Sequence, residues 1–530
     1  MEYTNIEKIV ILGIGGKAAY YVVKFLHLLD IEIEGYDIKP SDRTKELESW
    51  GIKINYRNPK EGEVFDGDFF IYSNDLNKDV QDRIKNDNKG KKSFELGKFY
   101  RGIIKDFENG NMNKSEVKAF KDSNIGPLFN IDINKTRYIS VTGTDGKTTT
   151  CTMIYHVLRL AGFKPALITT VGAYIGDTQL DTGLHTTTPS SQEIYELLKK
   201  VEEDCTHVII EATSHGLEQG RLAGLKFDSI GYTNITYEHL DYHGDWNSYC
   251  NAKSLLITDH LKDKAVVVLN KDDKAYGILK KKVIKKEVIS YSVEDLTDIT
   301  AENIEEDSEG IKFDLLFNQK KYTVKLPMLG KYNVSNFLCA LGICIKEGLE
   351  IENIIESILS FKGVEGRMEV IQNKPFKVIV DYAHTPSAQS NALKSVRLLV
   401  EENARLIHVF GSAGRRDFYK RPEMGKISNE LADITILTAE DPRLEDLKVI
   451  NDQIEKGWRE GKNQNGQLIR FDYMDRDVGV RRDAISKALE LARNGDVVII
   501  TGKAHEKSLC FGQTEYPWND IDEVKALLQS

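Results

Sequence analysis

Residues 138–150 place an apolar strand, a glycine turn and a run of hydroxyl residues in direct succession, followed by an apolar, helix-like stretch. Gly143 and Gly146 let backbone N–H groups curl around phosphate oxygens, and the following helix adds the positive end of its dipole. Lys147 can reach the outer phosphates, and the hydroxyl of Thr148 can hold Mg²⁺. The segment therefore predicts a strand–loop–helix unit that binds a nucleoside triphosphate.

The predicted phosphate loop consists of Gly143, Thr144, Asp145, Gly146, Lys147, Thr148 and Thr149. A glycine turn can also simply join a strand to a helix. The spacing here is shorter than in the usual Gly-x4-Gly-Lys-Ser/Thr loop, so the usual NTPase families fit poorly. Further motifs have to decide between these interpretations.

The composition excludes several classes of protein. A chain of 530 residues is too long for one core and suits roughly three domains. Its 41% hydrophobic and 29% charged residues are typical of a soluble globular protein, and its net charge of −10 argues against nucleic-acid binding. We expect no membrane insertion and no signal peptide. The six scattered cysteines indicate free thiols in a reducing cytoplasm and argue against a zinc site.

Short apolar runs alternate with helical stretches along the chain, which predicts α/β domains with mostly parallel sheets. We expect three domains: a Rossmann-like domain over residues 1–125, a central P-loop ATPase-like domain over 126–364, and a C-terminal Rossmann-like domain over 365–530. The polar stretches 105–121 and 302–310 are predicted to be surface loops or insertions. The clearest predicted strands are 31–37, 68–74, 206–211, 229–234, 265–270, 378–381, 406–410, 434–438 and 497–501.

The first domain carries a glycine turn of its own. A strand runs into Gly13, Gly15 and Gly16, and a second strand ends in Asp37 roughly twenty residues on. Ser73 follows a third strand. This pattern suits a nucleotide or pyrophosphate, and the later motifs favour a UDP group over NAD. A turn that merely packs a helix on a strand is the competing interpretation.

Three further side chains of the central domain suit phosphate chemistry. Glu211 ends a strongly apolar strand, where a carboxylate near the phosphate loop is well placed to hold Mg²⁺. His239 lies in a segment dense in metal-capable groups, and Lys253 lies on an apolar helix. Taken singly, His239 could be a core histidine and Lys253 a lysine that extends its stem along the surface.

Together these segments resemble the Mur ligase family, ATP-dependent enzymes that add amino acids to UDP-activated cell-wall precursors. The resemblance covers essentially the whole chain, and residues 142–149, 211–221 and 234–244 are most similar to the MurE branch. It implies that ATP phosphorylates the terminal carboxylate of the precursor and that the incoming amine attacks the acyl phosphate. It also implies a catalytic set of Lys147, Glu211, His239 and Lys253.

The resemblance implies a metal set as well. Mg²⁺, or Mn²⁺ in its place, would be held by Thr148, Glu211, His239 and Lys253, with Lys253 carbamylated by CO₂. The residues that match positions for the UDP-precursor are Thr187, Thr188, Thr213, Gln219 and Arg221. The matches to ATP contacts outside the loop are Asn270, Asn333, Arg367, Asp381 and His384. The guanidinium of Arg367 suits a phosphate better than a lysine would.

Two C-terminal segments match the elements that hold the incoming amino acid. The first contains Asp441 and Arg443, and the second contains Gly502 and Glu506. Arg443 can clamp a carboxylate with two parallel bonds, and Glu506 could hold a distal ammonium. A basic amino acid, lysine or diaminopimelate, is therefore expected. Glu440-Asp441 departs from the family's usual Asp-Asn and leaves both open.

The N-terminal glycine turn instead resembles the MurC and MurD branches, and the Asp-Ser-Arg motif of bacterial MurE enzymes is not found. Such a mixture would suit an archaeal pseudomurein peptide ligase whose carrier bears no muramic acid. The competing functions are those of a folylpolyglutamate or cyanophycin-type ligase, a silent nucleotide-binding protein and, more remotely, a dehydrogenase. The family leads us to expect a monomer that binds a UDP-linked peptide and a free amino acid.

Overall fold

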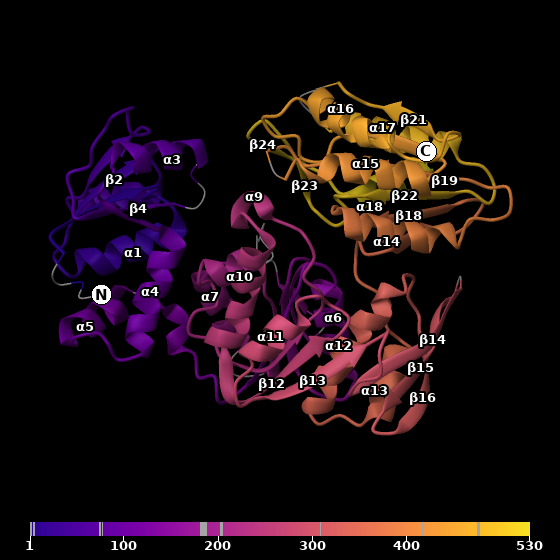
Figure 1. Ribbon diagram of the computed structural model, residues 1–530, viewed down its shortest axis with the longest axis horizontal. Coiled ribbons are helices and arrows are strands. Elements are labelled where there is room, and N and C mark those ends of the chain that lie inside the picture. The colour runs from indigo at the N-terminus through magenta and orange to yellow at the C-terminus, as the bar shows by residue number, and fades with distance from the viewer. Residues whose placement is uncertain are drawn as a thin grey trace.

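The computed structural model describes residue 3 and residues 6–73, 76, 78–123, 125–176, 178–180, 188–201, 205–307, 309–415, 417–473 and 478–529. Three main sheets with their helices form three units along the chain (Figure 1). The central unit lies below the other two in that view, and α9 (Leu240–His243) projects upward from it. The α/β fold class is confirmed.

The first unit is a parallel sheet in the order β3-β2-β1-β4-β5. The strands in its middle are largely apolar. The helices at 17–27, 96–108 and 114–123 cover one core, and the helix at 78–87 contributes to a second. The strands are β1 (Lys8–Leu12), β2 (Glu32–Asp37), β3 (Lys53–Tyr56), β4 (Phe69–Tyr72) and β5 (Lys92–Glu95). The helices are α1 (Lys17–His27), α2 (Asp42–Ser49), α3 (Lys78–Asp87), α4 (Leu96–Glu108) and α5 (Lys114–Ser123).

The prediction of a loop over residues 105–121 is wrong. Helix α4 continues to Glu108, and α5 fills most of the remainder. Apolar residues lie among the charges, with Val117 and Phe120 three residues apart, and Phe107 stacks on Phe120 with ring centroids 3.9 Å apart. Burial of this one apolar stripe stabilises two helices whose other faces are polar.

The central sheet is mixed, in the order β16-β15-β14-β13-β12-β11-β6-β10-β7-β8-β9. Strands in its middle are parallel, and both ends are antiparallel. Neighbouring residues of β6 alternate between two cores: Tyr138 faces one cluster and Ile139 the other. Helices therefore cover both faces, which explains why the middle strands are apolar throughout.

The element bounds of this unit follow in chain order. The strands are β6 (Arg137–Thr142), β7 (Pro165–Thr169), β8 (Gly172–Ile175), β9 (Thr178–Leu180), β10 (His207–Glu211), β11 (Phe227–Tyr232), β12 (Leu261–Asn270), β13 (Glu287–Ser292), β14 (Ile299–Asp307), β15 (Gly310–Phe317) and β16 (Lys320–Leu326). The helices are η2 (Pro127–Asn130), α6 (Lys147–Leu160), α7 (Ser191–Val201), α8 (Ser214–Glu218), α9, α10 (Trp246–Asp259), α11 (Tyr276–Lys282), α12 (Tyr332–Lys346) and α13 (Ile351–Ile358).

The predicted loop at 302–310 is also wrong, because β14 runs to Asp307 and β15 begins at Gly310. The charged residues of β14 lie on the exposed side of an antiparallel ladder. Ile311 and Phe313 of β15 are buried on the other side. Only Ile304 is apolar among residues 302–307, and pairing with β15 is what makes this charged segment a strand.

The third unit has a sheet in the order β17-β18-β22-β19-β20-β21, parallel except for the edge strand β17. Its strands are β17 (Glu369–Gln372), β18 (Lys377–Asp381), β19 (Leu406–Phe410), β20 (Ile434–Leu437), β21 (Gln467–Arg470) and β22 (Val497–Thr501), with a hairpin of β23 (Ser508–Phe511) and β24 (Thr514–Pro517). Its helices are α14 (Pro386–Arg397), α15 (Lys420–Leu431), α16 (Leu447–Trp458), α17 (Gly479–Leu491) and α18 (Asp520–Gln529).

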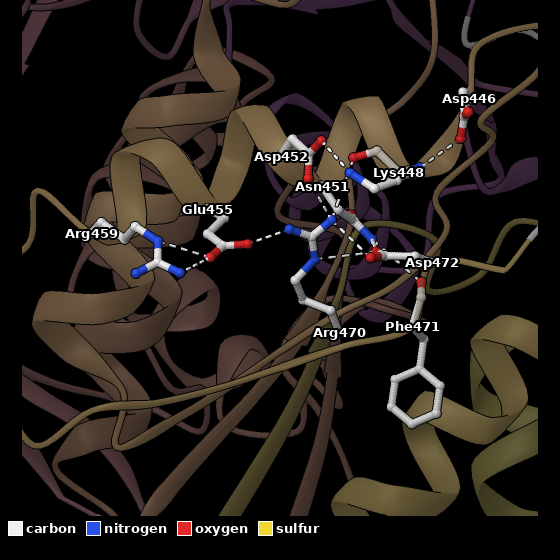
Figure 2. Close-up of polar contacts among 9 residues, drawn as sticks. All are labelled: Asp446, Lys448, Asn451, Asp452, Glu455, Arg459, Arg470, Phe471 and Asp472. Atoms are coloured by element: carbon white, nitrogen blue, oxygen red, sulfur yellow. Dashed lines mark hydrogen bonds and ion pairs between the residues drawn. The ribbon is translucent and has the colours of Figure 1, made fainter.

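An ion-pair network at the outer edge of this sheet fastens α16 to β21 (Figure 2). The guanidinium of Arg470 lies 2.7 Å from Asp452 and 2.8 Å from Asp472, and it also pairs with Glu455. Asn451 of α16 donates to Asp472 at 2.7 Å. These contacts fix an edge strand that has a neighbour on one side only.

Candidate active site

The phosphate loop connects β6 to α6, and its glycines are required by the backbone. Gly143 has φ of 155° and Gly146 has φ of 82°. A Cβ at Gly143 would lie 1.9 Å from Oγ1 of Thr233, and one at Gly146 would lie 2.1 Å from Oδ1 of Asn336. Neither position has room for a side chain. The close approach of bare backbone forms the kind of cradle that phosphate oxygens occupy.

The cationic and hydroxyl groups of the loop surround this cradle. Lys147 donates from Nζ to the carbonyl oxygen of Thr144 at 2.7 Å. Asp145 donates its backbone N–H to Oδ1 of Asn234 at 3.0 Å. Thr148 and Thr149 are buried in the first turn of α6. The geometry and charge of the loop fit a triphosphate.

Glu211 and Thr148 meet at one edge of the central sheet, because β10 lies beside β6. The hydroxyl of Thr148 donates to Oε2 of buried Glu211 at 2.8 Å. Thr170, a residue absent from the sequence prediction, donates to the same oxygen from its backbone N–H at 3.3 Å and its hydroxyl at 3.2 Å. A carboxylate and a hydroxyl that lie this close together are ligands that suit Mg²⁺.

Lys253 is buried in α10 beneath the same loop. Its ammonium donates to the carbonyl oxygen of Gly143 at 2.6 Å and lies 4.5 Å from the centre of the Tyr249 ring. Burial lowers the pKa of Lys253 well below its usual value, and the charge of Lys147 lowers it further. This shift favours the neutral amine more than in an exposed lysine, and the neutral amine is the form that reacts with CO₂.

A carboxylate that sequence reasoning did not single out joins two units. Glu238 lies with its Oε1 3.7 Å from Nε2 of His239 and 3.4 Å from Nε2 of His384, which belongs to the C-terminal unit. Tyr249 donates to Glu238 at 3.4 Å. Burial alone would raise the pKa of Glu238, but the two histidines hold it well below its usual range. Its position directly before His239 was the available signal.

Asparagines extend the nucleotide side of the site. Asn270 ends β12 and donates to the carbonyl oxygen of Thr233 at 2.8 Å. Asn336 connects Asn333 to the loop, because its Oδ1 leaves no room for a Cβ at Gly146 and its amide donates to Oδ1 of Asn333 at 2.9 Å. The predicted residues Asn270 and Asn333 are thus each linked to the phosphate loop through one intervening residue.

The predicted precursor-binding residues gather around the start of α8. The hydroxyls of Thr188 and Thr213 are 3.0 Å apart. Arg221 donates to the carbonyl oxygen of Thr188 at 2.6 Å and to Oε1 of Gln219 at 2.6 Å. The cluster adjoins the metal candidates, because Thr188 also donates to the carbonyl oxygen of Glu211 at 3.0 Å. The predicted residue Thr187 lies outside the described residues.

The glycine turn of the first unit and the end of β2 lie beside a hollow. Asp37 accepts the backbone N–H of Gly15 at 2.8 Å, and Gly16 precedes α1. A Cβ at Gly13, where φ is 78°, would lie 2.8 Å from Cβ of Ser73. A hollow of about 140 Å³ opens beside Gly13, Asp37 and Ser73. The predicted N-terminal residues are therefore brought together.

Asp381, at the end of β18, fixes the segment that connects the central unit to the C-terminal unit. Asp381 accepts the backbone N–H groups of Met368 and Ala383, each at 2.8 Å, and burial raises its pKa. Arg367 lies with its guanidinium 4.3 Å from the centre of the Tyr382 ring. A hollow of about 450 Å³ lies along this connection and includes Arg367 in its wall.

The amino-acid segments meet around a lysine that sequence reasoning passed over. Lys503 is 2% exposed, lies 2.8 Å from Oδ1 of Asp441 and pairs with Glu506. Tyr382 donates to the other oxygen of Glu506 at 3.0 Å. Burial alone would lower the pKa of Lys503, but Glu506 and Asp441 hold it above its usual value. Two predicted substrate carboxylates therefore share one cation.

The other predicted residues of this region lie on backbone with unusual dihedral angles. Asp441 and Arg443 have φ of 47° and 54°. The buried Nε of Arg443 and Oε2 of Glu440 have no hydrogen-bond partner within the described residues. A Cβ at Gly502, where φ is 110°, would lie 2.4 Å from that oxygen of Glu440. An unsatisfied guanidinium N–H and an unsatisfied carboxylate oxygen suit a zwitterionic ligand.

Within the described ranges, no group of three or more His, Cys, Asp and Glu side chains is gathered that could hold a metal ion. Of the predicted metal ligands, only Glu211 and His239 belong to these residue types. The other two are a threonine and a lysine. Over the same part of the chain, no helix has the length and apolar character needed to cross a membrane.

Comparisons with known proteins agree with the geometry. The family model of the Mur ligase middle domain matches residues 141–344, and that of the Mur ligase glutamate ligase domain matches 366–504. A UDP-N-acetylmuramoyl-L-alanyl-D-glutamate–2,6-diaminopimelate ligase of Clostridium tetani is 34% identical over 91% of this chain and 96% of its own length. The chain belongs to the Mur ligase family.

Solved structures extend the comparison. A UDP-N-acetylmuramoyl-L-alanyl-D-glutamate–2,6-diaminopimelate ligase is 26% identical, with a TM-score of 0.53 over 89% of this chain and 94% of its own. A pseudomurein peptide ligase type C from Methanothermus fervidus has a TM-score of 0.54 over 99% of both chains, but its 19% identity shows the fold alone. The protein is an enzyme of the ligase class, and the predicted family is confirmed.

Proposed function

We propose that the protein uses ATP to join a diamino acid to the terminal carboxylate of a UDP-linked peptide. The observation that carries this proposal is the approach of Glu238 to His384 at 3.4 Å, because it brings the C-terminal unit to the phosphate edge of the central sheet. A phosphate cradle and a zwitterion site then share one space. Ligation by way of a phosphorylated carboxylate needs both.

In the proposed reaction, a carboxylate oxygen of the acceptor attacks the γ-phosphorus of ATP, and the bond to the ADP oxygen breaks. The neutral amine of the amino acid then attacks the acyl carbon. Phosphate leaves with the bonding electron pair, and the amine proton passes to solvent. Lys147 compensates negative charge on the phosphates throughout, and the catalytic work is mainly positioning and charge neutralisation.

Mg²⁺ fits beside this phosphate site and would supply Lewis-acid neutralisation of the transferring group. Thr148 and Glu211 would hold it, as their 2.8 Å contact supports. We propose His239 and a carbamate on Lys253 as further ligands. Burial of the Lys253 amine supports the carbamate, since the neutral amine is the form that adds to CO₂; the anion so formed would be compensated by Mg²⁺ and by the nearby charge of Lys147.

For the incoming amino acid we propose diaminopimelate, with lysine as the second candidate. The relatives that carry diaminopimelate in their names support this choice. Arg443 offers an unsatisfied N–H to a carboxylate, and the carboxylates of Asp441 and Glu506 outnumber their shared Lys503. The region therefore suits a ligand with both a carboxylate and an extra ammonium.

The acceptor is proposed to bind with its UDP group in the hollow beside Gly13 and Asp37, and with its peptide at Thr188, Gln219 and Arg221. A carrier without muramic acid is a second candidate. The Rossmann-like glycine turn, in which Gly15 donates its backbone N–H to Asp37 at 2.8 Å, is the reason to retain this second candidate. We further propose a monomer in the cytoplasm, consistent with six free, buried cysteines.

The test is amino-acid-dependent ADP release with Mg-ATP over a grid of acceptors and amino acids. The acceptors are UDP-muramoyl dipeptide and a UDP-linked glutamyl peptide without muramic acid. The amino acids are diaminopimelate, lysine, alanine and glutamate. We expect turnover with the muramoyl acceptor and diaminopimelate. Turnover with the muramic-free acceptor alone would establish the second candidate, and silence across the grid would contradict both.

A further inference from the structure

Two arginine–aspartate pairs lie at opposite ends of the C-terminal sheet. Arg405 pairs with Asp496 at 2.7 Å, at the amino ends of β19 and β22, where the side chains are 25% and 2% exposed. Arg481 pairs with Asp520 at 2.7 Å, at the carboxyl end of β22, and both side chains are 0% exposed. The second pair lies behind the predicted amino-acid segments.

Arg481 connects those two segments through their backbones. Its guanidinium donates to the carbonyl oxygen of Ala439 at 2.9 Å, directly before Glu440. It donates to the carbonyl oxygen of Thr501 at 3.0 Å, directly before Gly502. The remaining donors grip Asp520 at 2.8 and 2.7 Å. One rigid planar fork therefore sets the spacing between the two segments.

Asp520 fixes the second segment from the other side. Its Oδ2 accepts the backbone N–H of Ala504 at 2.9 Å, and its own N–H donates to the carbonyl oxygen of Ala504 at 3.3 Å. Trp518 donates from the indole N–H to Oδ1 of Asp520 at 2.8 Å. Ala504 has φ of 43°, a region that alanine rarely adopts, so its conformation depends on such restraints.

We propose that Arg481 and Asp520 are positioning residues for the incoming amino acid. They touch no ligand themselves, because both are fully buried, but they hold Glu440 against Gly502 and fix the loop that carries Lys503 and Glu506. The charge of Arg481 also faces the carboxylates of Glu440 and Asp441. The expected change in KM for the amino acid rests on the proposed function. The expected ordering of the two segments does not.

The test compares Arg481→Lys with Arg405→Lys. Both replace a guanidinium that binds a buried aspartate and a backbone carbonyl of the same unit, and only Arg481 reaches the amino-acid segments. We expect Arg481→Lys to raise KM for the amino acid by about tenfold to a hundredfold, since small misplacements cost that much. KM for ATP and for the acceptor should stay within about twofold of wild type in both variants.

Hydrogen exchange of the ligand-free variants separates this proposal from the proposed function. We expect faster exchange at residues 440–443 and 502–506 in Arg481→Lys, and wild-type exchange there in Arg405→Lys. Equal changes in the two variants would overturn the positioning role. Faster exchange with an unchanged KM for the amino acid would also overturn it. A wild-type enzyme inactive on the whole grid would instead refute the proposed function, with the exchange result still standing.

A milder variant keeps the test decisive if Arg481→Lys does not fold. Trp518→Phe removes only the indole N–H that Asp520 accepts. It should raise KM for the amino acid by about fivefold, less than Arg481→Lys, because it removes one hydrogen bond to Asp520 and leaves the ion pair with Arg481 intact. A folded Trp518→Phe enzyme with wild-type KM and wild-type exchange at Ala504 would contradict the proposal.

Discussion

Lys253 and Lys503 are both buried lysines of the active-site region, yet their surroundings are opposite. Lys253 donates to a backbone carbonyl, and burial together with the charge of Lys147 lowers its pKa, although Glu238, Asp145 and Glu211 act in the opposite direction. Lys503 lies between Asp441 and Glu506, and its pKa is raised. Burial is the same in the two cases. The partner therefore decides whether a buried lysine is a reactive amine or a permanent structural cation.

The largest expected effect tests the reactive member of this comparison. Lys253→Ala should lower turnover by about a thousandfold, because the proposed carbamate is a ligand of the metal that would neutralise the transferring phosphoryl, and loss of one such electrostatic contribution is on that scale. Short carboxylates such as acetate should restore part of it by replacing the carbamate. Initial rates of ADP release would measure both effects. Wild-type activity of Lys253→Ala without added carboxylate would remove the carbamate from the mechanism.

Lys503→Met should mainly affect stability and the amino-acid site. It leaves Asp441 and Glu506 facing each other, and we expect a loss of about 2 kcal/mol. That is below the ~3–5 kcal/mol of fully buried pairs, because the carboxylates are partly exposed. Denaturant unfolding measures it. Lys448→Met, which breaks an exposed pair with Asp452 in the same unit, is the control and should cost under about 0.5 kcal/mol.

Depletion of CO₂ and bicarbonate should distinguish the two lysines chemically. Wild-type and Lys503→Met enzymes should both lose activity by severalfold in CO₂-free buffer and regain it when bicarbonate is returned. Lys253→Ala, whose residual activity no longer depends on a carbamate, should not respond. A stopped assay for ADP, with buffer exchange under argon, is sufficient. An equal response of all three proteins would trace the effect to another group.

The smallest effects are in the pH dependence of stability, and they have opposite signs. The folded pKa of Lys253 is lowered, so the unfolded state binds more protons and the free energy of unfolding rises with pH up to about 10.5. The folded pKa of Lys503 is raised. Its contribution is fully present below about pH 10.5 and is lost as pH rises further. Differences between wild type and each Lys→Met variant should show these slopes.

Much of the fold follows from local sequence. The strands predicted at 406–410 and 497–501 have those bounds in the structure, because each is a short, largely apolar run that ends at a glycine or a polar residue. Gly143 and Gly146, predicted to form a turn between a strand and a helix, do lie at such a turn with positive φ and no room for a side chain. The loop prediction at 105–121 failed where charges hide an apolar stripe, and the one at 302–310 failed because pairing with β15 makes a largely charged segment a strand.

The pairings within the site could not be predicted. Glu238 and His384 are far apart in sequence, and only the packing of two units brings them within 3.4 Å. The arrangement of Lys503 between Asp441 and Glu506 depends on a loop from another strand end. A single sequence shows which groups can ionise. It does not show which of them become neighbours, and the neighbours set their charge.

The contact between Glu238 and His384 has a consequence for the timing of turnover. At this contact His384 is 30% exposed and Glu238 is 13% exposed, so water can replace the histidine when the two units separate. Leu329 and Tyr332 of the central unit also pack against the C-terminal core, so opening at this contact would be a hinge motion about that packed connection, on the microsecond-to-millisecond scale of hinged domains. Product release, rather than bond formation, would then be rate-limiting, and an increase in solvent viscosity would lower the turnover rate.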